Sequence, residues 1–241
     1  MTDRSGGGPL LARRGFLLGA GAAAAAAGLA SCGLFDDGGP RRIDYGDEPS
    51  QFGELYLPAA DEPWPTVVMI HGGSWEVGTD LSITRDACED LRDRGYAVWN
   101  IEYRRVGEPG GGFPGTLDDV AAAIDRLTVI GADEPLALDR LLVMGHSAGG
   151  TLALWAASRD RLPVGAPGAG PAVEPRAAIS LAGVPDLALC SRANQVDGAC
   201  TRFVGGTPSE RPDRYAVMSP IELLPTGRPT TLVHGTDDVV V

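Results

Sequence analysis

One short segment, residues 145–149 (Gly-His-Ser-Ala-Gly), limits the folds open to this chain of 241 residues. An apolar run at 141–144 precedes it, and an apolar stretch of helical length, 148–157, follows it. The segment therefore predicts a tight turn from a buried strand directly into a helix. Such a turn imposes strained backbone angles on Ser147, and the flanking glycines leave the room that close packing requires. Units of this kind are typical of α/β folds.

The alternation of short apolar runs with amphipathic stretches continues from residue 53 onward. It predicts an α/β fold with one mainly parallel sheet flanked by helices. The expected strands are 54–57, 66–70, 96–101, 141–144, 177–181 and 230–233, and the expected helices are 80–94, 116–129 and 148–157. Because the stretch 182–226 has several prolines and no clear period, we expect it to pass over the carboxyl ends of the strands, where such sheets bind ligands.

Ser147 is the candidate nucleophile. A Gly-x-Ser-x-Gly segment between a strand and a helix forms a nucleophile elbow, which presents the serine hydroxyl to substrate. The helix behind it offers unpaired N–H groups and a partial positive charge, and both favour the oxyanion that forms when a serine attacks a carbonyl. The N–H group of Ala148 is the expected donor from this helix.

Residues 71–75 (His-Gly-Gly-Ser-Trp) directly follow the expected strand 66–70 and are the candidate second half of an oxyanion hole. Glycine lets the backbone approach a substrate carbonyl, so the N–H groups of Gly72 and Gly73 are the expected donors, with Ser74 as an alternative to one of them. We expect His71 to hold the loop by hydrogen bonds. Trp75 is open to two interpretations, a pocket wall or simple packing.

Residues 234–238 (His-Gly-Thr-Asp-Asp) follow the expected strand 230–233, where an acid that orients a catalytic histidine occurs in chain order. Together with 71–75 and 145–149, this segment resembles the esterase and lipase branch of the α/β-hydrolases. Within that branch the chain is similar to the acetyl- and feruloyl-esterase-like (BD-FAE-like) group, whose His-Gly-Gly-x-Trp loop is shared with kynurenine formamidases. The resemblance covers the chain from about residue 45 to its last residue.

The resemblance implies an α/β-hydrolase fold without cofactor or metal, and it makes Asp238 the triad acid, with Asp237 as the alternative. It also implies a further helix, a last strand and a Gly-His loop that carries the general base. The histidines of this chain, at positions 71, 146 and 234, do not match that loop. We therefore expect the C-terminal strand and helix to be missing, the base to lie beyond residue 241, and the chain as it stands to be inactive. A natural pseudo-hydrolase is the alternative.

The first 32 residues have the layout of an export signal. Arg13 and Arg14 precede Gly-Phe-Leu-Leu, as in twin-arginine signals, and the run Leu-Ala-Ser-Cys that ends at Cys32 resembles a bacterial lipobox, in which that cysteine is acylated. The alternative is an ordinary secretory signal with a chance cysteine. We expect a lipid-anchored protein outside the cytoplasm, with a flexible tether over 33–50 and a hydrolase domain over 51–241.

Three further cysteines are expected to meet an oxidising compartment. Cys190 and Cys200 bracket a polar stretch without an apolar period, and we expect them to form a disulfide that closes a short loop. Cys88 lies in the expected helix 80–94 and is expected to be a small buried apolar residue. Because the sequence has no Cys-x-x-Cys spacing, it indicates no zinc site.

The charge balance argues against nucleic acid as a partner. The formal net charge is −12, and 20 basic residues are scattered among 32 acidic ones, without the basic cluster that phosphate binding requires. We expect Arg104 and Arg105 to pair with Asp118 and Asp119 instead of binding a substrate carboxylate.

Three functions follow from these observations. The first is a serine carboxylesterase, acetylesterase-like, that acts outside the cytoplasm on small-molecule or polysaccharide esters without an obligate protein partner. The second is an arylformamidase or peptidase with the same machinery, acting on an amide bond. The third is a hydrolase-like surface protein that binds a ligand without turnover.

Overall fold

The computed structural model describes residues 39–59 and 63–240. The predicted export signal, with Arg13, Arg14 and Cys32, lies outside the described residues, as does the first part of the predicted tether, 33–38. None of the helices in the described part of the chain is long and apolar enough to cross a membrane.

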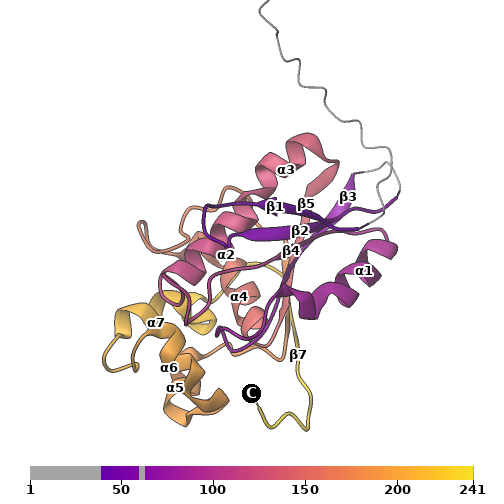
Figure 1. Ribbon diagram of the computed structural model, residues 1–241. Coiled ribbons are helices and arrows are strands. Elements are labelled where there is room, and N and C mark those ends of the chain that lie inside the picture. The colour runs from indigo at the N-terminus through magenta and orange to yellow at the C-terminus, as the bar shows by residue number, and fades with distance from the viewer. Residues whose placement is uncertain (1–38, 60–62, 241) are drawn as a thin grey trace, which may run out of the picture. The chain divides into compact units, whose positions relative to one another are not determined.

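The strands of the described residues form one sheet in the order β1-β2-β4-β3-β5-β6-β7 (Figure 1). The pairings of β1 with β2 and of β2 with β4 are antiparallel, and all later pairings are parallel. The predicted mainly parallel sheet is therefore confirmed. The strands are β1 (Arg41–Asp44), β2 (Phe52–Tyr56), β3 (Trp64–Ile70), β4 (Ala97–Ile101), β5 (Leu136–His146), β6 (Ala177–Leu181) and β7 (Thr230–Val233).

Helices cover both faces of this sheet. In Figure 1, α1 lies on one face, beside β2 and β4, and α2, α3 and α4 lie on the other. The bounds are η1 (Leu81–Thr84), α1 (Arg85–Asp93), α2 (Gly115–Asp125), α3 (Leu127–Asp133), α4 (Ala148–Ala156) and η2 (Arg159–Arg161). The single helix expected over 116–129 is thus two helices that meet at Arg126, and the helix expected from residue 80 begins with a 3₁₀ turn.

Successive side chains of a strand point to opposite faces, and this alternation divides the core in two. Val68 and Ile70 of β3 join the large core under α2 and α4, whereas Met69 joins a small core that includes Cys88 of α1. Cys88 is fully buried, as predicted, and burial raises the pKa of its thiol to about 12. The thiol therefore stays protonated at neutral pH, as expected of a cysteine that serves in packing.

The tether predicted over 33–50 is wrong for its described part. Arg41–Asp44 forms β1 and pairs antiparallel with β2. After β1, the hydroxyl of Tyr45 donates to the main-chain oxygen of Glu102 at 2.7 Å, and Ser50 is buried. The segment is rich in Gly, Pro and Asp, but its backbone groups find partners in the neighbouring strand, and composition does not reveal pairing of this kind. The domain therefore begins at β1 and not at residue 51.

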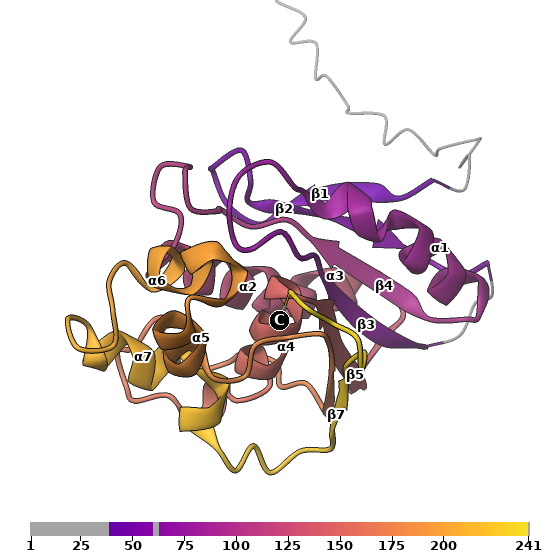
Figure 2. The ribbon, with the colours of Figure 1, turned by 90° about the horizontal axis from the view of Figure 1, so that it is seen from below.

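The stretch expected as an irregular excursion, 182–226, contains short helices that pack on one another (Figure 2). They are α5 (Leu187–Ala193), η3 (Gln195–Gly198), α6 (Ala199–Val204), α7 (Pro212–Met218) and η4 (Pro220–Leu223). A disulfide between Cys190 and Cys200, with Cα atoms 6.2 Å apart, joins α5 to α6. This is the pairing predicted from the sequence. Helices of one or two turns are too short to give a clear apolar period, which explains why the sequence did not predict them.

Candidate active site

Ser147 lies at the turn from β5 into α4, with φ of 52° and ψ of −122°. Left-handed φ values are rare for residues other than glycine, so the turn has the strained geometry predicted for it. Gly145 and Gly149, two positions away on either side, are glycines because nothing larger fits. A Cβ atom at Gly145 would lie 2.3 Å from Gly149 O, and one at Gly149 would lie 2.1 Å from Ile70 O. The strand and the helix are therefore packed backbone to backbone around the serine.

The loop after β3 lies directly beside this turn. A Cβ atom at Gly72 would lie 3.2 Å from Ser147 Cβ and 2.8 Å from His146 O, so only glycine allows so close an approach. Gly73 follows with φ of 112°, a conformation that favours glycine. Ala148, at the first position of α4, directly follows the serine and is buried. The structure thus places residues 72 and 148, two of the three predicted N–H donors, next to the candidate nucleophile, and Gly73 follows in the same loop.

His71 is part of the support of this loop. Its ring is fully buried and stacks on that of Tyr103, with centroids 4.4 Å apart. Nε2 lies 2.9 Å from Glu102 Oε1, and Nδ1 lies 2.7 Å from Gly72 O. Both ring nitrogens are therefore engaged, and His71 has the structural position predicted for it instead of that of a proton carrier.

Trp75 lies in the core and does not form a pocket wall. Its side chain is 1% exposed, and its ring stacks on that of Phe203 from α6. Of the two interpretations left open by the sequence, packing is therefore correct. No local pattern in the sequence indicates Phe203 as the partner of Trp75.

The candidate acid lies at the same end of the sheet as Ser147. In the sheet register His146 pairs with Leu181, and Leu181 pairs with Val233, so β5, β6 and β7 end level with one another. Neighbouring strands are spaced by about 4.8 Å, which places the ends of β5 and β7 roughly 10 Å apart. Ser147 and the segment after β7 therefore lie at the same edge of the sheet, on either side of the end of β6.

Within that segment, Asp238 is the better placed of the two candidate acids. Its side chain is 19% exposed, and its Oδ2 lies 3.3 Å from Nε2 of His234. Asp237 is exposed to solvent. Asp238 Oδ1 also accepts a hydrogen bond from Val240 N at 2.9 Å, which fixes the carboxylate within its turn.

The predicted pairing of arginine with aspartate is confirmed for one pair. Arg104 donates to Asp119 through Nη2 at 2.7 Å and through Nε at 2.8 Å, and Asp119 is buried. Arg105 pairs instead with Glu108, at 3.2 Å. Both arginines are thus engaged in ion pairs within the domain.

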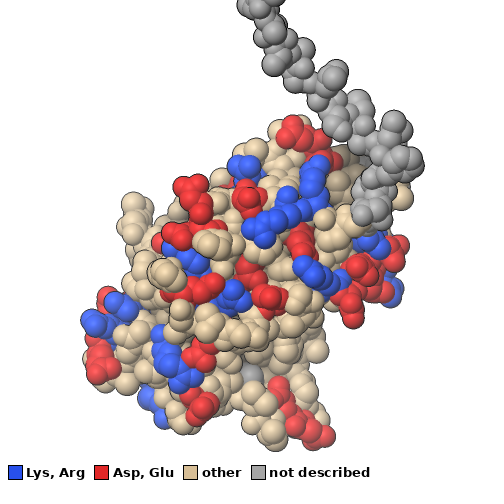
Figure 3. Space-filling model, viewed as in Figure 1, with Lys and Arg blue, Asp and Glu red and all other residues tan. Residues whose placement is uncertain are grey.

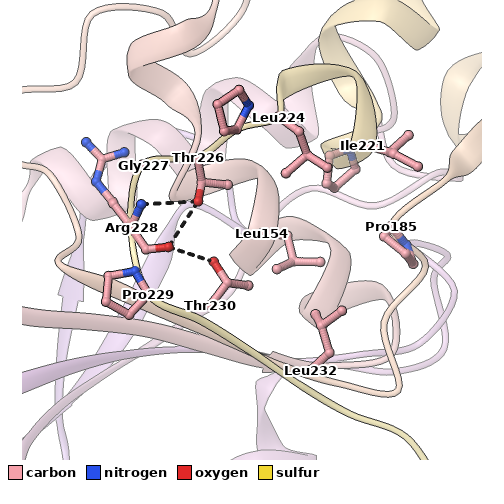
Figure 4. A pocket seen from close by; sticks show the side chains of 12 residues that line it. Leu154, Pro185, Ile221, Leu224, Thr226, Gly227, Arg228, Pro229, Thr230 and Leu232 are labelled. Carbon is pink, nitrogen blue, oxygen red and sulfur yellow. Dashed lines mark hydrogen bonds between the residues drawn. The ribbon is translucent and has the colours of Figure 1, made fainter.

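An apolar cavity of about 680 Å³ lies beside α4 and β7 (Figure 4). Leu154, which lies about 10 Å along α4 from Ser147, lines it with Leu232 of β7 and with residues of the η4 region. Neither Ser147 nor the loop at 72–73 is part of its wall. The cavity therefore does not coincide with the candidate catalytic groups.

Charged side chains give no sign of a basic patch on the face drawn in Figure 3, where basic and acidic residues are interspersed. Among residues 39–59 and 63–240, no group of three or more His, Cys, Asp or Glu side chains is arranged to hold a metal ion.

Comparison with known proteins identifies the family. The model of the BD-FAE family matches residues 54–241, which is most of the chain and includes all three motifs of the candidate site. The chain belongs to the BD-FAE family.

Two curated relatives are similar to parts of this BD-FAE family chain. A kynurenine formamidase of Aspergillus versicolor is 35% identical over 103 residues, which are 36% of this chain and 33% of the relative. An isoprenylcysteine alpha-carbonyl methylesterase of Arabidopsis thaliana is 30% identical over 121 residues, 48% of this chain and 27% of the relative. The matches thus span about a third or less of the length of these relatives.

Among solved structures, a truncated form of a carbohydrate esterase from gut microbiota has a TM-score of 0.73 and 22% sequence identity, and it covers 86% of this chain and 81% of that one. The structure therefore has the α/β-hydrolase fold, as the sequence predicted.

Proposed function

We propose that the protein is a serine carboxylesterase that cleaves small-molecule or carbohydrate esters. One observation carries this proposal: Ser147 has the strained φ of a nucleophile elbow and lies against Gly72 of the loop after β3. A carbonyl held over the serine would meet the N–H groups of Gly72, Gly73 and Ala148, which would stabilise the oxyanion of the tetrahedral intermediate. The family of the chain and the methylesterase among its relatives support an ester as the substrate.

We infer that the general base is a histidine from outside residues 1–241. A serine hydroxyl is a weak nucleophile until an imidazole takes its proton. In the described chain, the ring nitrogens of His71 are engaged in the core, and His234 lies with Asp238 after β7. Ser147 and Asp238 follow strands whose ends lie roughly 10 Å apart on either side of β6, a separation that an imidazole could bridge. Asp238 would then orient this imidazole and stabilise its charged form.

A formamide is the second candidate substrate, because one relative is a kynurenine formamidase. Phenyl formate and formanilide separate the two, since they share the acyl group and the ring and differ only in the bond that is cleaved. The test uses the full-length gene product, with each rate divided by the uncatalysed rate of the same compound. A larger acceleration for phenyl formate supports the esterase, and a larger one for formanilide supports the amide hydrolase. If neither of these compounds nor p-nitrophenyl acetate is turned over, a protein that binds without turnover replaces both.

We propose that the protein acts outside the cytoplasm, held to the membrane by a lipid on Cys32. The support is in the sequence: Arg13 and Arg14 precede an apolar run that ends in Leu-Ala-Ser-Cys. The disulfide between Cys190 and Cys200 is also suited to an oxidising compartment.

The Cys32→Ser variant is expected to lose its membrane attachment. Without the thiol, no acyl chain can be added, and the apolar anchor that holds the protein at the lipid surface is lost. Cell fractionation and immunoblotting would measure this, with Cys88→Ser as the matched control because Cys88 is buried in the domain. Equal membrane fractions for the Cys32→Ser variant and the wild type would exclude the lipid anchor.

A further inference from the structure

The loop that carries Gly72 and Gly73 has an unusual backbone. Gly73, Ser74 and Trp75 follow one another with φ of 112°, 55° and 58°. For a bulky aromatic residue such as Trp75, a left-handed φ is a clear outlier. A backbone of this kind persists only where the surrounding structure holds it in place. The contacts of Trp75 therefore help to hold the loop that carries residues 72 and 73.

Main-chain hydrogen bonds hold the loop on one side. Trp75 O accepts from Val106 N at 2.7 Å, and Val77 N donates to Val106 O at 3.1 Å. The indole ring has no comparable restraint, because Trp75 Nε1 is buried without a hydrogen-bond partner in the part of the chain that the structure describes. Packing must therefore fix the position of the ring.

Helix α6 supplies that packing. The rings of Phe203 and Trp75 lie parallel, with centroids 4.6 Å apart and an interplanar angle of 4°, and each side chain is 1% exposed. The preceding residue, Arg202, forms an ion pair with Glu76. Two consecutive residues of α6 thus contact two consecutive residues of the loop.

The disulfide holds α6 in this position. A helix of six residues is only marginally stable by itself, and α6 lies between Gly198 and Gly205, which both have left-handed φ values. Cys200 ties α6 covalently to Cys190 of α5. One residue further along each helix, the hydroxyls of Ser191 and Thr201 lie 2.6 Å apart. Helix α6 is therefore attached to α5, and its residue Phe203 packs against Trp75 of the loop.

We propose that α6 acts as a clamp, meaning that it holds the oxyanion loop at residues 72–77 in its conformation. Phe203 is the positioning residue and acts through Trp75. The disulfide between Cys190 and Cys200 keeps α6 in place. Phe203 does not touch the candidate nucleophile. It holds the left-handed loop so that the N–H groups of Gly72 and Gly73 face the carbonyl on Ser147. The clamp rests on the proposed function of Ser147, and it adds to that function the part of the fold that keeps the oxyanion hole in shape.

The test compares Phe203→Leu and the double variant Cys190→Ser/Cys200→Ser with the wild type, all as full-length protein. Hydrogen–deuterium exchange of residues 72–77 reports on the loop, and ester hydrolysis reports on the oxyanion hole. We expect amide exchange in this loop to become at least about tenfold faster in both variants. We expect kcat to fall about 10- to 100-fold with KM nearly unchanged, because displaced donors affect the transition state more than substrate binding.

Ile130→Ala is the matched control, since Ile130 is a buried residue of α3 that contributes to the same large core but belongs to neither the loop nor α6. This variant is expected to lower the melting temperature while kcat and the exchange of residues 72–77 stay at wild-type values. The clamp is excluded if loop exchange is unchanged in Phe203→Leu, or if loop exchange rises while kcat stays the same. If the wild type lacks turnover, the proposed function fails, and loop exchange alone then decides whether α6 holds the loop.

Discussion

The Ser147→Ala variant of the full-length protein is expected to lose at least about 10⁴-fold in kcat/KM for ester hydrolysis. The hydroxyl supplies the nucleophile. Alanine removes this hydroxyl and adds no atom that the surrounding residues would have to accommodate. The backbone of the turn is held by independent contacts, including the hydrogen bond from Ser147 N to Leu181 O at 2.8 Å. The melting temperature should therefore change by no more than a few degrees. Initial rates on p-nitrophenyl acetate, measured beside thermal unfolding, check both statements.

A matched control for this substitution is Ser82→Ala, because Ser82 is exposed in the 3₁₀ turn before α1. Its kcat/KM should stay within about twofold of the wild type, as expected for a surface substitution. A Ser147→Ala variant that keeps more than a tenth of the wild-type rate would contradict the assignment of Ser147 as nucleophile.

The Gly149→Ala variant is expected to lose about 3 kcal/mol of stability and most of its activity. The added Cβ would lie 2.1 Å from Ile70 O and 2.5 Å from His71 O. Both are main-chain atoms at the end of β3, so no side-chain rotation can relieve the contact. The end of β3 would have to move away from the serine turn, which would displace Gly72 from Ser147. Urea unfolding and ester hydrolysis would measure the two losses.

Gly131→Ala is the matched control, because it makes the same glycine-to-alanine substitution at another position. Gly131 lies in α3, and a Cβ atom there would lie 3.3 Å from Leu138 Cδ1, the end of a flexible side chain. Because alanine is the better helix former, stability should stay the same or rise by up to about 1 kcal/mol. Equal stabilities for the Gly149→Ala and Gly131→Ala variants would show that the turn is not packed backbone to backbone.

The sequence predicted those elements that have a clear apolar pattern. The bounds of β6 and β7 agree with the expected 177–181 and 230–233, and both strands pair parallel with their neighbours in the sheet. Strand β5 is longer than expected because its first residues, Leu136 and Ala137, pair with β3 before a register shift, and no pattern indicates such a shift. Strand β1 was missed because backbone pairing with β2 forms it, not an apolar face.

The candidate site was predictable to the extent that it depends on local motifs. Glycines at 72, 145 and 149 are required by close backbone contacts, and such requirements leave a clear pattern in the sequence. The contact between Trp75 and Phe203 joins segments that are far apart in the chain, and no local pattern encodes it. The preference for Asp238 over Asp237 came from the resemblance to the family, and in the structure Asp238 is the less exposed of the two.

Covalent labelling of the full-length protein with a fluorophosphonate, followed by peptide mass spectrometry, tests the central claim most directly. Such a reagent forms a stable phosphonyl ester with an activated serine. The account predicts about one adduct per chain, on Ser147, and loss of ester hydrolysis in step with labelling. The account would be contradicted if ester hydrolysis persisted without an adduct on Ser147. It would also be contradicted if an adduct on another residue abolished ester hydrolysis.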